Sequence, residues 1–120
     1  MGELLDIGHG ISVSDAFCRA MQRLRSQLSP SEQDFIPNID WVYFKSGSNA
    51  GTYNWALNFH SRSWMLPENL ISIKDFQLHI TPGNRDRLRN KIIHFTENRL
   101  EVLSSEGFSR HGKQSSPTSS

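Results

Sequence analysis

Histidine is the residue type in this chain that is best suited to acid and base chemistry, because its pKa lies at about 6.5. Five histidines occur, at positions 9, 60, 79, 94 and 111. His60 and His79 fall on the polar sides of predicted strands, so they can lie close together if those strands are neighbours. Such a pair could supply the acid and the base that cleave a phosphodiester.

The tetrapeptide LHIT, residues 78–81, resembles one half of the His-hydrophobic-Thr signature of the two-histidine phosphoesterases. That family carries the signature twice, and the resemblance implies phosphodiester hydrolysis that depends on His79. The other candidate segment, FHSRS, has Arg62 where the signature has Ser or Thr. We therefore keep phosphoesterase activity as a remote alternative, assign no catalytic residue, and interpret both histidines mainly as solvent-facing side chains.

The loop GSNAG, residues 47–51, has small residues of the kind that cradle phosphates. A Walker-type loop needs a Lys and a Ser or Thr after its glycines, at the start of a helix. Here Lys45 precedes the glycines, and strand-forming residues follow Gly51. The segment is therefore predicted to be a hairpin bend, with Gly47, Asn49 and Gly51 supplying positive-φ conformations.

No metal or cofactor is expected, because no His, Cys or carboxylate pair has a recurring zinc or calcium spacing. The single cysteine, Cys18, cannot form an internal disulfide, which is typical of a reducing compartment. A formal net charge of +1 gives no global field towards nucleic acid or anionic membranes. We find no secretory signal pattern and no apolar run approaching the roughly 18 residues of a membrane span. A cytoplasmic protein without a membrane partner is expected.

The predicted elements follow from the hydrophobic periodicity. Apolar steps of three and four between Val13 and Leu28 predict a helix at residues 13–29, capped by Ser12 or Ser14. Aromatic and β-branched runs at residues 39–46 and 53–60 predict an antiparallel hairpin.

Further along, residues 70–80 change phase at Lys74 and Asp75, which indicates a bend between two short strands. A stripe of apolar residues from Leu88 to Leu103 predicts a second helix from Arg85 to about Ser104. The predicted fold is α+β, in the order α-β-β-β(-β)-α, with both helices on one face of a small antiparallel sheet of three or four strands. Residues 1–104 would form one domain, and residues 105–120 a disordered tail.

Basic residues on the two predicted helices suggest a second function. Arg87, Lys91 and His94 would form a column on the second helix, and the layout of helix, three strands and helix is similar to the double-stranded-RNA-binding domain. That resemblance implies contacts to phosphates, although the family's Lys-Lys-x-Ala-Lys run is absent and Asp86 interrupts the cluster. The candidate nucleic-acid-binding residues are Arg19, Arg23, Arg85, Arg87, Arg89, Lys91 and His94.

The aromatic strands suggest the leading function, which is protein binding. The first strand has no clearly polar side, because Trp41 and Tyr43 share one face while Val42 and Phe44 share the other. One pair should lie exposed on the sheet face that the helices leave open, unless the amino-terminal segment or the RSWML region, residues 62–66, covers that face. We therefore expect an adaptor, inhibitor or regulatory subunit that binds a protein partner or a second copy of itself. The candidate binding residues are Trp41, Val42, Tyr43, Phe44, Asn54, Asn58, His60 and His79.

Overall fold

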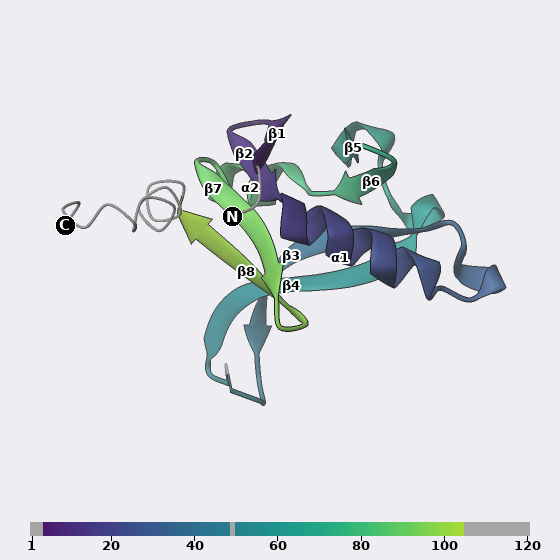
Figure 1. The fold of residues 1–120 in the computed structure, drawn as a ribbon. Coiled ribbons are helices and arrows are strands. Elements are labelled where there is room, and N and C mark those ends of the chain that lie inside the picture. The colour runs from purple at the N-terminus through teal and green to yellow at the C-terminus, as the bar shows by residue number, and fades with distance from the viewer. Residues whose placement is uncertain (1–3, 49, 105–120) are drawn as a thin grey trace.

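The computed structural model describes residues 4–48 and 50–104, and Figure 1 shows their arrangement. Within these residues the chain forms two four-stranded sheets, two α-helices and three short 3-10 helices. In chain order the elements are β1 (Leu4–Gly8), β2 (Ile11–Ser14), α1 (Asp15–Ser26), η1 (Pro30–Glu32), β3 (Phe35–Phe44), β4 (Thr52–Ser61), η2 (Arg62–Trp64), η3 (Pro67–Asn69), β5 (Leu70–Ile73), β6 (Phe76–His79), α2 (Pro82–Arg87), β7 (Lys91–Thr96) and β8 (Arg99–Ser104).

Each sheet contains one parallel pair between segments that are distant in the sequence. The first sheet has the strand order β1-β2-β7-β8, and β2 runs parallel to β7 with Val13 opposite Ile93. The second sheet has the order β4-β3-β6-β5, and β3 runs parallel to β6 with Asn38 opposite His79. The remaining neighbours are antiparallel. Both sheets are therefore mixed.

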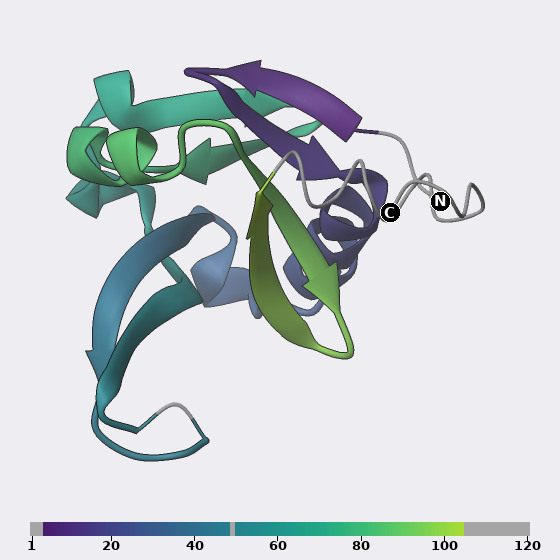
Figure 2. The ribbon, with the colours of Figure 1, turned by 90° about the vertical axis from the view of Figure 1, so that its left-hand side faces the viewer.

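One core joins the two sheets to α1, which lies against them in both views (Figures 1 and 2). The buried face of α1 carries Phe17 and Met21, both without solvent exposure. Phe17 contacts Phe76 of the second sheet, with ring centroids 6.4 Å apart. The same cluster includes buried residues of both sheets, namely Ile11, Val13, Ile39, Leu78 and Ile93. The helix thus links two sheets that do not share a strand.

The prediction of one small antiparallel sheet with two helices on one face is wrong. Only the first predicted long helix exists, and a second sheet takes the place of the other. The amino-terminal residues, for which we had predicted no regular structure, form the β1–β2 hairpin. The order α-β-β-β(-β)-α therefore becomes two strands, a helix, four strands, a short helix and a final hairpin.

The second predicted helix fails because a turn divides its apolar stripe. Glu97 and Asn98 have φ values of 51° and 63°, which form a tight two-residue turn of a kind that a helix does not contain. On either side of the turn the chain alternates, so Ile93 and Phe95 pair with Val102 and Leu100. These four residues also pack against the core. Steps of three and four across a short turn therefore imitated a helical period.

Other predicted elements are confirmed. The first helix is α1, whose N-cap is Ser14, although its start lies later than expected because Val13 and Ser14 belong to β2. The aromatic hairpin is β3–β4, and its bend contains Gly47 and Gly51 at φ values of 86° and 85°, whereas Asn49 lies outside the described residues. The phase change between β5 and β6 is also a turn, with Lys74 at a φ of 51°.

Two predictions, the disordered tail and the absence of a membrane span, can be compared with the structure only for the described residues. The predicted tail at residues 105–120 lies outside the described residues. Among residues 4–48 and 50–104, no helix is long and apolar enough to cross a membrane.

Candidate functional site

Four aromatic rings form a cluster towards the closed end of the β3–β4 hairpin. Trp41 lies opposite Trp55, and Tyr43 lies opposite Tyr53, so all four rings share one face of the hairpin. The ring centroids are 4.8 Å apart for Trp41 and Trp55, 6.1 Å for Trp41 and Tyr53, and 5.2 Å for the two tyrosines. We call these four residues the aromatic cluster.

The aromatic cluster lies on the core-facing side of the second sheet, beyond the end of the core. Ile39, two residues before Trp41, is completely buried, whereas Tyr43 is 50% exposed and Tyr53 is 58% exposed. The hairpin thus extends past the part of the sheet that the rest of the molecule covers, as Figure 2 shows for β3 and β4. Exposure of these rings arises from that extension and not from an uncovered opposite face.

The short helix α2 supports the base of this hairpin. The Arg87 guanidinium lies over the Trp41 ring, 5.5 Å from its centroid, in a cation-π contact. Asn84 is buried, and its Nδ2 donates a hydrogen bond of 3.2 Å to Oδ1 of Asp40. These two contacts fix α2 against β3.

A groove of about 850 Å³ lies between strand β4 of the second sheet and strand β8 of the first. This volume falls within the range of roughly 300–1,000 Å³ that is common for ligand pockets. Mainly apolar side chains and a few polar ones line it: Leu24, Phe44, Asn54, Trp55, Leu57, Phe59, Phe95, Asn98, Arg99, Leu100, Glu101, Val102 and Leu103. We call this feature the inter-sheet groove.

The inter-sheet groove runs between two strand edges. In the described part of the chain β4 pairs with β3 alone, and β8 pairs with β7 alone. Asn54 and Trp55 project from opposite faces of β4, and both line the groove, so the groove follows the edge of that strand. Unpaired backbone groups of an edge strand are available for pairing with another chain.

The opposite face of the second sheet carries a row of polar side chains. His79 Nδ1 donates a hydrogen bond of 2.8 Å to Oδ1 of Asn38, and Nδ2 of Asn38 donates one of 3.0 Å to Oδ1 of Asn58. Burial, with a smaller effect of the nearby Arg85 charge, lowers the pKa of His79. The neutral imidazole is therefore favoured, with its proton on Nδ1.

This row only partly matches the predicted pair of histidines. His60 and His79 share the polar face, but strand β3 lies between β4 and β6, which carry them. His60 is exposed, whereas His79 is half-buried and held by Asn38. The described residues contain no group of three or more His, Cys, Asp or Glu side chains that could hold a metal ion. Burial raises the pKa of the Cys18 thiol, which disfavours the thiolate that a nucleophile needs.

The structure divides the predicted protein-binding residues among three places. Trp41 and Tyr43 belong to the aromatic cluster, and Phe44 and Asn54 line the inter-sheet groove. The others lie on the polar face of the second sheet: Val42, Asn58, His60 and His79. The face that we expected to be aromatic and open is thus mainly polar.

The predicted nucleic-acid-binding residues are distributed over three elements and the turn after α2. Arg19 and Arg23 lie on α1, Arg85 and Arg87 on α2, and Lys91 and His94 on β7. The predicted basic column does not exist, because α2 ends at Arg87 and a strand follows.

Intramolecular contacts also occupy several of these basic side chains. Arg85 donates hydrogen bonds to the carbonyl oxygens of Ile80 and Glu68, at 3.1 and 2.8 Å. Arg89 pairs with Asp86 at 2.7 Å. Arg85 and Arg89 therefore have partners within the fold.

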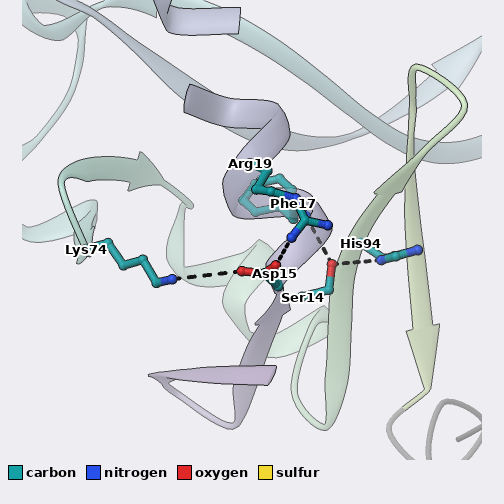
Figure 3. Close-up of polar contacts among 6 residues, drawn as sticks. All are labelled: Ser14, Asp15, Phe17, Arg19, Lys74 and His94. Carbon is teal, nitrogen blue, oxygen red and sulfur yellow. Dashed lines mark hydrogen bonds and ion pairs between the residues drawn. The ribbon is translucent and has the colours of Figure 1, made fainter. Parts of the chain in front are cut away.

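Figure 3 shows two more of the predicted nucleic-acid-binding residues, Arg19 on α1 and His94 on β7. Arg19 pairs with Asp15 one turn earlier, and Lys74 approaches the same carboxylate at 4.0 Å. Ser14 Oγ accepts a hydrogen bond of 3.1 Å from the backbone N–H of Phe17 and lies 2.7 Å from Nδ1 of His94. Ser14 is only 2% exposed, so this serine and histidine pair joins α1 to β7 and leaves no room for a substrate.

Sequence reasoning missed the residues that β8 contributes to the inter-sheet groove. Leu100 and Val102 lie on one side of β8, Arg99 and Glu101 lie on the other, and all four line the groove. The alternation of polar and apolar residues from Arg99 to Val102 was the available signal. A helical interpretation of the same segment concealed it.

Comparisons of the chain with protein-family models, with curated proteins and with solved structures find no match.

Proposed function

We propose that this protein is a cytosolic interaction module that binds an apolar segment of a protein partner in the inter-sheet groove. The observation that carries the proposal is the position of Trp55. This residue lines the groove and also contacts Trp41 of the aromatic cluster. The groove and the exposed rings therefore form one continuous surface, which is large enough for a segment of polypeptide.

The composition of this surface fits a protein partner. Aromatic residues are enriched at the centres of protein interfaces, and charged residues are depleted there. The apolar part of the groove comes from residues such as Leu57, Phe59 and Val102, while Arg99 and Glu101 supply charges of both signs. Charges of both signs give little attraction for a polyanion but allow specific pairs with a peptide.

A displayed library of random peptides tests the proposal. We expect the unmodified protein to enrich peptides that lose binding in two separate variants, Trp55→Ala and Asn54→Arg. The first removes the ring shared by the groove and the cluster. The second places a long side chain in the groove without removing any apolar contact from the core. Circular dichroism and urea unfolding confirm that each variant is folded before binding is compared.

The matched control is Trp64→Ser, because Trp64 is 84% exposed on η2 and does not line the groove. Enriched peptides should bind this variant as they bind the unmodified protein. If no peptide is enriched, or if the groove variants bind as well as the control, the inter-sheet groove is not a docking site and the proposed function is wrong.

A further inference from the structure

The backbone groups that β8 offers to a partner can be deduced from its turn. Thr96 and Arg99 flank the two-residue turn, and the pair that flanks such a turn is hydrogen-bonded. Hydrogen-bonded pairs then alternate along the antiparallel ladder. Arg99 and Glu101 therefore direct their N–H and C=O groups to β7, whereas Leu100 and Val102 direct theirs to the free edge.

At the free edge of β8, the side chains and the backbone groups of the same two residues face the inter-sheet groove. Leu100 and Val102 are half-buried, line the inter-sheet groove and pack against the core. The same two residues offer unpaired backbone groups to that groove. We propose, as a refinement that rests on the proposed function, that the groove binds an extended peptide as an additional antiparallel strand beside β8.

The occupant must be a linear segment and not the edge of another folded sheet. A strand that already belongs to a sheet carries a neighbour at about 4.8 Å. Placed beside β8, that neighbour would meet β4, which forms the other wall of the groove. A single extended peptide has no such neighbour, so it needs room for one strand, whereas a second copy of this chain would need room for two.

Charge complementarity specifies the order of residues in the peptide. Arg99 and Glu101 flank Leu100 in the sequence, and their side chains project from the same face of β8. The distance of 3.8 Å between Nη2 of Arg99 and Oε2 of Glu101 is long for an ion pair. In antiparallel addition, the peptide residue opposite Leu100 is preceded by the residue opposite Glu101 and followed by the residue opposite Arg99. The partner should therefore read basic, apolar, acidic from its amino end.

These two charged positions are the ones where side chains interact most closely. With Leu100 in a hydrogen-bonded pair, the positions opposite Arg99 and Glu101 are non-hydrogen-bonded pairs, where the Cα atoms lie about 4.5 Å apart. Opposite charges there stabilise the pairing, and like charges oppose it. An apolar residue two positions before the one opposite Leu100 would face Val102 and complete the match.

Two capped peptides of identical composition test this assignment by fluorescence anisotropy. The first is Thr-Val-Lys-Leu-Glu-Thr, and the second, Thr-Val-Glu-Leu-Lys-Thr, exchanges the two charges. We expect the first to bind about tenfold more tightly than the second, because two favourable cross-strand pairs become unfavourable. The double variant Arg99→Glu/Glu101→Arg should reverse that preference while leaving the fold intact by circular dichroism.

A backbone variant tests strand addition separately from charge. Methylation of the leucine nitrogen in the first peptide removes a hydrogen bond to Leu100 and should abolish measurable binding. Methylation of the first threonine nitrogen, which lies beyond the ladder, should leave binding unchanged.

The outcomes separate this inference from the proposed function. If library peptides bind the groove but the two charge isomers bind equally, or if methylation at leucine has no effect, strand addition beside β8 is wrong and the docking site stands. If the chain dimerises in sedimentation experiments and Leu100→Asp makes it monomeric, the occupant is a second copy and the inference falls. If no library peptide binds, both proposals fall together.

Discussion

Trp41 and Trp55 lie directly opposite each other on β3 and β4, with ring centroids 4.8 Å apart and an interplanar angle of 57°. This tilted cross-strand pair joins the aromatic cluster to the inter-sheet groove. Aromatic pairs of this kind contribute about 0.5–1.5 kcal/mol beyond the area that they bury.

A double-mutant cycle should measure that coupling. Urea unfolding of Trp41→Val, Trp55→Val and the double variant, followed by circular dichroism, should give a coupling free energy of about 0.5–1.5 kcal/mol. In a control cycle, Trp41→Val combined with Trp64→Val should be additive, because Trp64 lies on η2, outside the cluster. Additive effects in the first cycle would show that the two rings do not stabilise the hairpin together.

The turn between β7 and β8 gives a prediction whose sign depends on the fold. Glu97 has a φ of 51°, and left-handed geometry costs a non-glycine residue about 1–2 kcal/mol. Glycine relieves that strain but loses more chain entropy on folding, about 0.5–1 kcal/mol. Glu97→Gly should therefore raise the free energy of unfolding, by up to about 1.5 kcal/mol.

The matched control for that turn is Thr96→Gly, which places glycine in the adjacent strand residue and should destabilise the protein. If residues 85–104 were a helix, both substitutions would destabilise by about 1 kcal/mol. Urea unfolding of the two variants therefore distinguishes the hairpin from the helix that periodicity alone suggests.

The Ser14 hydroxyl supports a third prediction. It accepts the N-cap hydrogen bond from Phe17 and contacts His94, so Ser14→Ala should lower the free energy of unfolding by at least about 1 kcal/mol. Ser12→Ala, two residues earlier on β2, is the control and should have a smaller effect. Equal losses would mean that the cap does not stabilise α1.

The pKa of His79 predicts how stability changes with pH. Burial and the Arg85 charge lower this pKa from its ordinary value of 6.5, so the unfolded chain binds a proton more readily than the folded one. The contribution of His79 to stability is therefore fully present above pH 6.5 and declines as pH falls through the folded pKa. His79→Gln, which retains a donor for Asn38, should flatten this dependence.

Two measurements check that prediction. A proton NMR titration of the His79 ring should give a midpoint below 6.5, and unfolding free energies above and below that pH should differ less in His79→Gln. A midpoint at or above 6.5 would mean that burial does not control this group.

Hydrophobic periodicity was sufficient to predict part of the fold. The residues of α1 and of the β3–β4 hairpin have patterns that only one local structure satisfies, since the first has a helical stripe and the second has two runs of aromatic and β-branched residues around a glycine-containing bend. The segment from Arg85 to Ser104 satisfies both periods, because a two-residue turn at Glu97 and Asn98 shifts one strand against the next. Glu97 is not a residue that usually signals a turn. Asn98 tolerates positive φ but is a weaker turn signal than glycine.

Most of the candidate site could not be predicted from the sequence, because it depends on pairing between distant strands. The inter-sheet groove exists only because β4 and β8 become facing edges of separate sheets, and that depends on the pairing of β2 with β7. No local pattern specifies which distant strand Val13 will meet. The aromatic residues were identified as candidates, but their exposure comes from the length of the hairpin past the core, which is a property of the whole fold.

The contact between Ser14 and His94 spans 80 residues of sequence, and the parallel pairing of β2 with β7 spans a similar separation. Chains dominated by such non-local pairings fold in milliseconds to seconds, because a large loop must close before its contacts form. The β1–β2 hairpin is also synthesised before β7 and must wait for β7 to emerge. During that interval the edge of β2 that later pairs with β7 is unpaired and open to association with other chains.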